Sequence, residues 1–464
     1  MLFGRRDKQG PSDSSGDYSD DKDNEVVETR KKASQKNNET ERGDLSKELQ
    51  EARNRIFDEL LKQMDLRKVM QTAPDVLLAE IEQFIIRYAE DKHILIGYVD
   101  QKRMASDIVN DMIGLGPLQQ LMGDQSISDI MINGPNTVYV ERRGRIEKTN
   151  VKFRSNQHLL QIAQRIANQS GRRVDESSPL LDARLKDGSR VNVVIPPVAL
   201  DGVSVSIRRF SDKGITLADM IASGSVSQQI CDFLSIISKC RMNVIVSGGT
   251  GSGKTTMLNA LSQLIDPGER IVTIEDSAEL RLKQPHVVRL ESRPANIEGQ
   301  GRITIRDLVQ NALRMRPDRI IVGECRGGET FDMLQAMNTG HDGSMSTIHA
   351  NNADEALNRL ENMVLMSGFE LPTTVIKGYI AGAVEIIIQT ARMRDGVRRI
   401  SEIVEITGYN GTVINTKPLF KFIPLDTDSE GKIIGEFKFS GQMPDLIEKV
   451  EYLGLGDELR RSLG

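Results

Sequence analysis

One stretch of the sequence has the composition of a phosphate-binding loop. The apolar residues 244–247 run into GGTGSGKTT, which matches the pattern GxxxxGK followed by Ser or Thr, and a helical stretch begins near Met257. Glycines let a backbone wrap around an anion without Cβ clashes, and a helix N-terminus directs N–H groups and a positive dipole end toward it. We predict that this loop binds nucleotide phosphates, with Lys254 on the β and γ phosphates and the Thr255 hydroxyl on Mg²⁺. The residues of the predicted loop are Gly248, Gly249, Thr250, Gly251, Ser252, Gly253, Lys254, Thr255 and Thr256.

Two further predicted strands end in carboxylates. Residues 270–274 are followed by Glu275, and residues 319–323 are followed by Glu324. In open α/β sheets ligands lie beyond the carboxyl ends of the strands, so we expect both carboxylates to converge on the loop that holds Lys254. A carboxylate in that place holds Mg²⁺ or orients an attacking water, which indicates nucleotide hydrolysis with Glu275 as a second metal ligand.

Two of the five histidines lie in one segment, GHDGSMSTIHA, which spans residues 340–350. Neither a cysteine pair nor zinc-ligand spacing accompanies them, so we do not expect a metal site there. His349 follows a further predicted strand, and together with Thr347 it fits a sensor of the γ-phosphate. A histidine that packs in the core with its hydrogen bonds satisfied explains the same spacing, so both interpretations stay open.

The segment around the loop has the pattern of a parallel sheet covered by helices. Beyond Gly214, short apolar stretches alternate with helical ones, and the predicted strands are residues 243–247, 270–274, 287–290, 319–322 and 345–348. Strands and helices in alternation favour a mostly parallel sheet with helices on both faces. We therefore predict an α/β fold in which residues 213–464 form the nucleotide-binding domain.

Three different patterns precede this domain. Residues 1–45 are rich in charged residues and nearly free of apolar ones, so we predict a disordered tail that is either solvated or a tether for a partner. Residues 46–116 place apolar residues at helical spacing, which predicts a small helical bundle. In residues 117–212, β-branched runs separated by turn signals flank one helical stretch, which predicts an α+β domain.

Composition and charge exclude several classes of protein. The chain has 464 residues with 61 Lys and Arg against 66 Asp and Glu, a net charge of −5, and it lacks Trp. This composition provides no basic groove or stacking surface, so nucleic acid is not an expected partner. No apolar run reaches the ~18 residues of a membrane-spanning helix, and the first ten residues lack a signal-peptide core. We therefore expect a cytoplasmic protein that reaches a membrane only through partners, and its three cysteines fit a reducing compartment.

In their order along the chain, the motifs resemble those of a known family. The loop GGTGSGKTT, then TIED, then RPDRIIVGECR and then GHDGSMSTIHA are similar to the Walker A, Asp box, Walker B and His box of the secretion ATPases, which serve type II and type IV secretion and type IV pili. Within this superfamily, residues 46–424 are most similar to the CpaF family, the ATPases of Tad (Flp) pilus assembly. A sequence with only three cysteines lacks the tetracysteine zinc element of other branches, which favours this one.

The resemblance implies a RecA-like ATPase domain preceded by a PAS-like α+β domain, with ATP and Mg²⁺ bound at their junction and six subunits in a ring. Carried over position by position, it makes Glu275 and Glu324 the catalytic carboxylates and His341 and His349 the His-box residues. Arginines of the amino-terminal domain complete the site in this family, and a guanidinium that neutralises the transferring phosphoryl group is worth roughly 10³ to 10⁵ in rate. The matching arginines are Arg184, Arg190 and Arg208.

The function implied by the resemblance is a motor that hydrolyses ATP at the inner face of the inner membrane and drives pilus assembly through a membrane-embedded platform protein. Two alternatives stay open: an ATPase that exports DNA or effectors through a type IV secretion system, and a regulator that binds nucleotide without performing work. A helicase or packaging motor shares the RecA-like core, but the composition disfavours it. No guanine-reading NKxD tetrad occurs, so the expected nucleotide is ATP.

Overall fold

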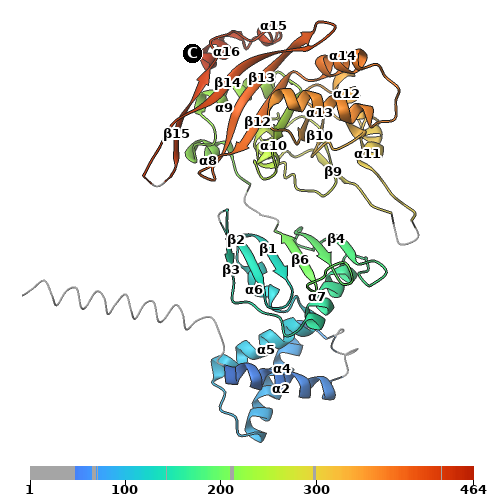
Figure 1. Cartoon of the computed structure of the whole chain (residues 1–464), viewed down its shortest axis with the longest axis vertical. Coiled ribbons are helices and arrows are strands. Elements are labelled where there is room, and N and C mark those ends of the chain that lie inside the picture. Colours follow the sequence, from blue (N-terminus) through green and yellow to red (C-terminus); the bar gives the residue numbers. More distant parts are fainter. Residues whose placement is uncertain are drawn as a thin grey trace, which may run out of the picture. The chain divides into compact units, whose positions relative to one another are not determined.

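The computed structural model describes residues 47–64, 69, 72–142, 144–209, 214–295, 299–429 and 431–464. The tail predicted over residues 1–45 lies outside the described residues. The chain divides into two units, which we call unit 1 (Met1–Arg209) and unit 2 (Phe210–Gly464) (Figure 1).

Unit 1 begins with helices that pack as a bundle. They are α2 (Lys47–Gln63), α4 (Pro74–Asp91) and α5 (Tyr98–Ile113), and the short α6 (Leu118–Gly123) follows them. Pro74 occupies the first turn of α4, where its missing N–H breaks no helical hydrogen bond. Buried side chains recur in these helices at spacings of three or four residues, which makes one apolar face on each. Examples are Ile56 and Leu60, then Leu77, Ile81 and Ile85, then Met104 and Ile108.

A six-stranded antiparallel sheet makes up the rest of unit 1 (Figure 1). Its order is β3-β2-β1-β6-β5-β4. The strands are β1 (Ile127–Asn133), β2 (Val138–Arg142), β3 (Arg145–Lys148), β4 (Leu180–Arg184), β5 (Arg190–Val194) and β6 (Ser204–Arg208). Alternate residues such as Ile130 and Val205 are buried in one core with Leu159 and Ile162 of α7 (Asn156–Gln169). Since side chains alternate across a strand, the other face of the sheet carries the polar residues.

A buried carboxylate joins the bundle to the sheet-bearing part of unit 1. Asp111, near the end of α5, is only 4% exposed. Its Oδ2 lies 2.5 Å from Arg53 Nη2 of α2 and 3.7 Å from Arg154 Nε, and its Oδ1 lies 3.4 Å from His158 Nε2 of α7. One carboxylate thus contacts basic groups from separate elements, and the helical bundle and the sheet pack together within unit 1.

Unit 2 is built on a nine-stranded sheet in the order β15-β14-β13-β12-β7-β11-β10-β8-β9. The strands from β12 to β9 in this order pair in parallel, whereas β13, β14 and β15 add an antiparallel extension. The parallel strands are β7 (Val244–Gly248), β8 (Ile271–Glu275), β9 (Val287–Glu291), β10 (Arg319–Val322), β11 (Met345–Ile348) and β12 (Ile386–Arg392). The extension consists of β13 (Arg398–Tyr409), β14 (Ile414–Thr427) and β15 (Ile433–Phe439).

Helices cover both faces of this sheet (Figure 1). One core receives side chains from α8 (Leu217–Ala222), α9 (Gln228–Lys239), α10 (Lys254–Ser262), α15 (Ile447–Tyr452) and α16 (Gly456–Leu463). The other receives them from α11 (Ile305–Ala312), α12 (Glu329–Asn338), α13 (Ala353–Leu365) and α14 (Thr373–Ala383). Successive residues of β7 show the division, since Val244 and Val246 belong to the first core and Ile245 to the second. The predicted fold class is therefore confirmed: an α/β protein with a RecA-like domain after a PAS-like α+β domain.

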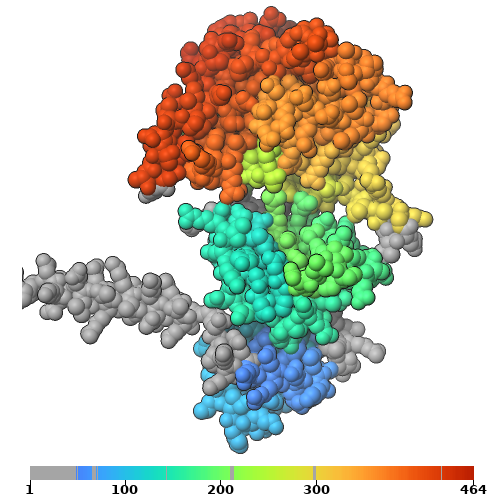
Figure 2. All heavy atoms as spheres, in the orientation of Figure 1, coloured from blue at the N-terminus to red at the C-terminus, as the bar shows by residue number. Residues whose placement is uncertain are grey.

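Figure 2 shows one face of the molecular surface. The last strands and helices form a continuous part of the visible surface of unit 2, drawn in red. Within the described ranges, no helix is both long enough and apolar enough to span a bilayer. All three cysteines are buried and outside disulfides, and burial raises the pKa of the Cys325 thiol to about 12. The thiols are therefore neutral.

Candidate nucleotide-binding site

The predicted phosphate loop connects β7 to α10 at the carboxyl edge of the sheet. Gly251 (φ +70°) and Gly253 (φ +97°) adopt left-handed conformations that favour glycine. Gly248 has no room for a side chain, because a Cβ there would come within 2.5 Å of the Thr390 carbonyl oxygen. The loop therefore requires glycine at 248, 251 and 253, and α10, which begins at Lys254, supplies the backbone N–H groups of a helix N-terminus.

Lys254 is buried although it carries a charge, with 7% of its surface exposed. Its Nζ donates to Gly249 O at 3.0 Å and lies 3.4 Å from His349 Nδ1 and 3.3 Å from His349 Nε2. Burial, followed by the charge of Lys254, lowers the pKa of His349 from its ordinary value, so the imidazole is neutral near pH 7. A neutral ring has one acceptor nitrogen, which can take a hydrogen bond from the ammonium group.

Glu324 follows β10 and joins the same cluster. Its Oε1 lies 2.9 Å from His349 Nε2, and its Oε2 accepts a hydrogen bond from Arg326 Nη2 at 2.9 Å. Arg326 Nη1 also lies 3.9 Å from Asp276 Oδ2. The neutral imidazole fits this arrangement if Nε2–H donates to Glu324 and Nδ1 accepts from Lys254. A chain of contacts then links the loop lysine, the histidine and the carboxylate.

Glu275 ends β8 and is buried, with 3% of its surface exposed. Its Oε2 accepts hydrogen bonds from the backbone N–H groups of Glu279 at 2.7 Å and Leu280 at 2.9 Å. Desolvation by burial outweighs these bonds and raises the pKa of the carboxyl from its ordinary value of 4.5 to about 7. Its Oε1 is also buried and finds no hydrogen-bond donor among the described residues. A buried oxygen without a donor fits a cation, so Glu275 suits the predicted Mg²⁺ site, and the part of Thr255 in that site stays a prediction.

The two carboxylates lie on neighbouring parallel strands. β8 pairs with β10, and a Cβ at Gly323 would come within 2.9 Å of Glu275 Cγ, so the Glu275 side chain packs on the residue before Glu324. The structure thus brings Glu275 and Glu324 to the edge of the sheet where Lys254 and His349 lie. This cluster combines a buried cation, two carboxylates and a neutral imidazole beside a glycine loop, which is the equipment for binding and hydrolysing a nucleotide.

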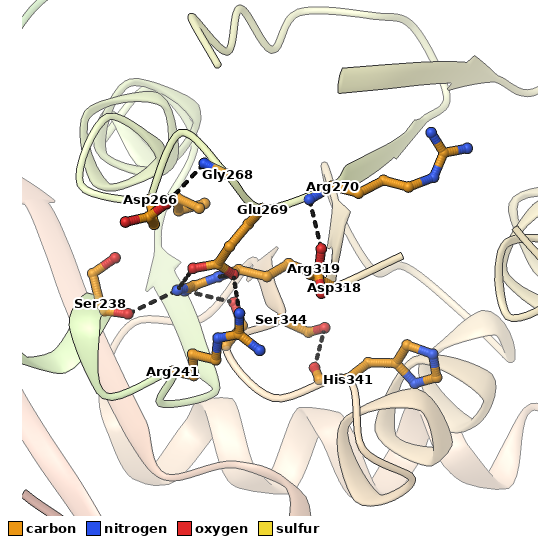
Figure 3. A network of polar contacts seen from close by, with 12 residues as sticks. Ser238, Arg241, Asp266, Gly268, Glu269, Arg270, Asp318, Arg319, His341 and Ser344 are labelled. Atoms are coloured by element: carbon orange, nitrogen blue, oxygen red, sulfur yellow. Dashed lines mark hydrogen bonds and ion pairs between the residues drawn. The ribbon is translucent and has the colours of Figure 1, made fainter. Parts of the chain in front are cut away.

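His341 was predicted to lie at the nucleotide site, but it lies at the opposite edge of the sheet. β11 runs parallel to β7; His349 follows its carboxyl end, next to the loop, whereas His341 precedes its amino end. Four strand residues separate the two edges by roughly 13 Å. Figure 3 shows His341 beside Ser344, whose Oγ donates to His341 O at 2.7 Å. Within unit 2, the structure therefore does not bring His341 to the phosphate loop. The motif resemblance assigned it to the site, although it precedes the predicted strand 345–348 and His349 follows that strand.

The amino edge near His341 holds a buried ion pair (Figure 3). Arg319 is 1% exposed, and its Nε and Nη2 donate to the two carboxylate oxygens of Glu269 at 2.6 Å and 2.8 Å. Nη2 also donates to Ser238 O of α9 at 2.8 Å. Gly343 must lack a side chain, because a Cβ there would come within 2.5 Å of Arg319 Nη1. The pair links β10 to α9 and to the loop before β11. The ion pair near His341 therefore has a structural role.

The three predicted arginines lie in one row of the antiparallel sheet of unit 1. Arg184 lies opposite Arg190, and Arg190 lies opposite Arg208. Arg190 and Arg208 also line a hollow of about 340 Å³, where Arg208 Nε lies 3.9 Å from Asp129 Oδ1. The phosphate loop belongs to unit 2, so the part of these arginines in the site stays a prediction.

Three residues beside the loop were not among the predicted site residues. Thr390 Oγ1 lies 2.9 Å from Ser252 Oγ, Arg398 Nε donates to Gly251 O at 2.9 Å, and Arg326 holds Glu324 as described above. Arg326 comes two residues after Glu324, so a cation beside a strand-end carboxylate was a readable signal. The other two lie more than a hundred residues from the loop, and no local pattern points to them.

These features define the class of the protein: a RecA-like nucleotide-binding protein with a P-loop and carboxylates on adjacent parallel strands. The family described as "Type II/IV secretion system protein" matches residues 111–406. The chain belongs to this family.

Several named proteins are similar to this chain in sequence. A putative conjugal transfer protein of Mycobacterium tuberculosis is 38% identical over 309 residues, which cover 65% of this chain and 87% of that protein. The type IV secretion system protein VirB11 of Bartonella quintana is 32% identical over 327 residues, which cover 62% of this chain and 91% of that protein. Among solved structures, the VirB11 ATPase of Brucella suis in complex with sulphate is 31% identical, over 62% of this chain and 95% of that chain, with a TM-score of 0.35. The predicted membership of the secretion ATPase superfamily is confirmed, and the CpaF branch within it stays a prediction.

Proposed function

We propose that this chain is a hexameric motor ATPase that hydrolyses ATP to drive Tad (Flp) type IV pilus assembly through an inner-membrane platform protein, at the cytoplasmic face of that membrane. The observation that carries the ATPase is the gathering of buried Lys254 with Glu275, Glu324 and His349 at the end of the strand that leads into the P-loop. The similarity of the four ordered motifs to CpaF supports the pilus system.

Each residue of the cluster has a distinct part in the proposed reaction. The loop N–H groups would cradle the phosphates that ATP and ADP share, and Lys254 would reach the β and γ phosphates. Thr255 and Glu275 would hold Mg²⁺, which supplies positive charge beside the phosphates when bound. Glu324, whose side chain is 22% exposed, is the more accessible carboxylate and orients the attacking water and accepts its proton. His349 contacts both Lys254 and Glu324, so a phosphate that draws Lys254 away also changes the contacts of Glu324.

The arginine row of unit 1 is the proposed link from chemistry to movement. Arg184, Arg190 and Arg208 would close on the phosphates when ATP is bound and release them after hydrolysis. Domain closure of this kind converts a local change of charge into rigid-body displacement. In a ring, that displacement is the work delivered to the platform protein.

ATP turnover by the purified chain with Mg²⁺ tests the proposal. We expect Lys254→Ala to lose turnover, and Glu324→Gln to retain ATP binding while turnover falls by about 10² to 10⁴. Arg314→Ala, on an exposed side chain away from the loop, is the charge-matched control and should hydrolyse ATP like the wild type. Wild-type turnover no faster than that of Lys254→Ala would contradict the proposal.

A type IV secretion ATPase that exports DNA or effectors is the second candidate, favoured by the names of the conjugal transfer and VirB11 relatives. Deletion of the gene separates the two. Loss of pili with export intact supports the pilus motor, and loss of export with pili intact supports the secretion ATPase. Normal piliation with a Glu324→Gln copy would instead support a regulator that does not use hydrolysis.

A further inference from the structure

A β-hairpin far from the motifs in sequence lies directly beside the phosphate loop. β12 pairs in parallel with β7, with Thr390 opposite Gly248, so the end of β12 lies at the edge where the loop begins. The chain then turns back into β13, in which Arg398 lies opposite Arg392. In the sheet order, this hairpin flanks β7 on one side, and β10 and β8, which position Glu324 and Glu275, lie on the other.

The hairpin holds the loop from outside at two points. Thr390 Oγ1 donates to Ser247 O at 3.0 Å and lies 2.9 Å from Ser252 Oγ. Arg398 Nε donates to Gly251 O at 2.9 Å. The Arg398 side chain also packs along the loop, since a Cβ at Gly253 would come within 3.1 Å of Arg398 Cδ. Arg398 therefore contacts the left-handed glycines, the segment of the loop with the greatest conformational freedom.

Arg398 is presented from a fixed position. The neighbouring Asp395 is buried and its Oδ2 lies 2.8 Å from Arg399 Nη2. Asp395 Oδ2 also accepts a hydrogen bond from Ile433 N at 3.0 Å, which ties the turn to β15. The Arg399 hydrogen bond and the two backbone N–H groups hold the pKa of Asp395 at about 2, so this tie persists across the physiological pH range. The hairpin is thus a rigid support for a long, otherwise adaptable side chain.

We propose that Arg398 is a positioning residue of the nucleotide site: it holds the Gly251–Gly253 segment in the shape that receives the phosphates, and its positive charge favours the bound anion. The inference rests on the proposed function, because it assigns a role at the same site. The loop N–H groups cradle the phosphates that ATP and ADP share, whereas the γ-phosphate lies toward the carboxylates on the other side of β7. Arg398 therefore strengthens the binding of both nucleotides and has little effect on the chemical step.

Nucleotide affinity of the full chain tests this role. We expect Arg398→Ala to raise the Kd of Mg-ADP and of Mg-ATP by about tenfold each, the equivalent of about 1.4 kcal/mol, measured by calorimetry. KM for ATP should rise by a similar factor, while kcat at saturating ATP stays within about threefold of the wild type. Arg398→Lys keeps the charge but loses the Nε–H donor, so an intermediate Kd is expected.

Arg394→Ala is the matched control, because it removes the same charge from an exposed residue of the same hairpin. It should leave both affinities within about twofold of the wild type, and the thermal midpoints of all variants should agree within a few degrees. Unchanged affinities in Arg398→Ala would overturn the proposal, and so would a loss confined to ATP, which would place Arg398 at the γ-phosphate. A wild-type chain that binds no nucleotide would instead contradict the proposed function itself.

Discussion

Replacing Glu275 with glutamine tests the buried carboxyl at the end of β8. Between pH 4.5 and about 7, the folded chain holds a proton on Glu275 that the unfolded chain releases, because burial raises the pKa in the folded state. The folded state binds more protons in this window, so this group makes stability fall as the pH rises through it. At about 1.4 kcal/mol for each pH unit between the two pKa values, the loss amounts to about 3 kcal/mol.

A glutamine at position 275 does not titrate, so the variant lacks this loss of stability with rising pH. Its amide oxygen can accept from the N–H groups of Glu279 and Leu280, as Glu275 Oε2 does, and it has no charge to desolvate. We therefore expect the free energy of unfolding of Glu275→Gln, relative to the wild type, to rise by about 3 kcal/mol from pH 4.5 to pH 8. For a unit of this size that corresponds to about 6 to 12 °C in thermal midpoint. ATP turnover should fall by about 10²-fold or more, because the amide cannot serve as an anionic metal ligand.

The assay is thermal unfolding of both proteins from pH 4.5 to pH 8 without nucleotide or Mg²⁺, followed by turnover measurements with both. Comparing the two proteins at each pH removes the titration that they share, so the difference reports on position 275. A difference that stays flat with pH would refute the reasoning, because it would mean that Glu275 titrates alike in the folded and unfolded chain.

Two buried charge clusters give predictions of stability. Arg319→Met leaves the Glu269 carboxylate buried without its bidentate partner, so we expect the free energy of unfolding of unit 2 to fall by about 3 to 5 kcal/mol in urea titrations at pH 7. A loss below about 1 kcal/mol would show that the pair is not intact in solution. Asp111→Asn removes the anion shared by Arg53 and His158, and we expect about 3 kcal/mol less stability in unit 1, seen as an earlier thermal transition. An unchanged transition would mean that packing alone joins the bundle to the sheet.

The parallel part of the fold could be predicted because local pattern and global fold agree there. Five predicted runs of four or five residues became β7 to β11, and all of these except the edge strand β9 are buried on both faces, where apolar residues are favoured. The sixth parallel strand, β12, was not predicted, although it is also buried. The antiparallel extension had no such signal. β13 and β14 are long, and charged residues interrupt their apolar runs, including Arg399 and Glu405, which are buried. Their pairing also depends on register across the sheet, which one sequence does not specify.

The site residues likewise divide into those that the sequence could place and those that it could not. Glu275 and Glu324 could be placed because they lie at or just after the end of a strand, and Lys254 because its glycine loop follows one. Parallel strands bring their carboxyl ends to one edge of the sheet. His341 was assigned to the site by its motif, but it precedes β11, and the Arg319 ion pair occupies that edge instead. Arg398 reaches the loop only through the pairing of β12 with β7 and of β13 with β12, so its contact exists in the register and not in any short pattern.

The contacts around Lys254 imply that nucleotide binding is an exchange of partners. The ammonium already has a carbonyl and an imidazole, and that imidazole also contacts Glu324, which Arg326 holds on its other side. A phosphate that draws the Lys254 ammonium toward itself takes a hydrogen-bond donor away from the neutral ring of His349. The ring can then retain its contact with Glu324 or give up that contact to water. Arg326 competes for the same carboxylate, so its hold on Glu324 must weaken before that group can accept a proton. In the proposed reaction, such a site would keep Glu324 engaged by His349 and Arg326 until phosphate binds, which would confine hydrolysis to the nucleotide-bound state.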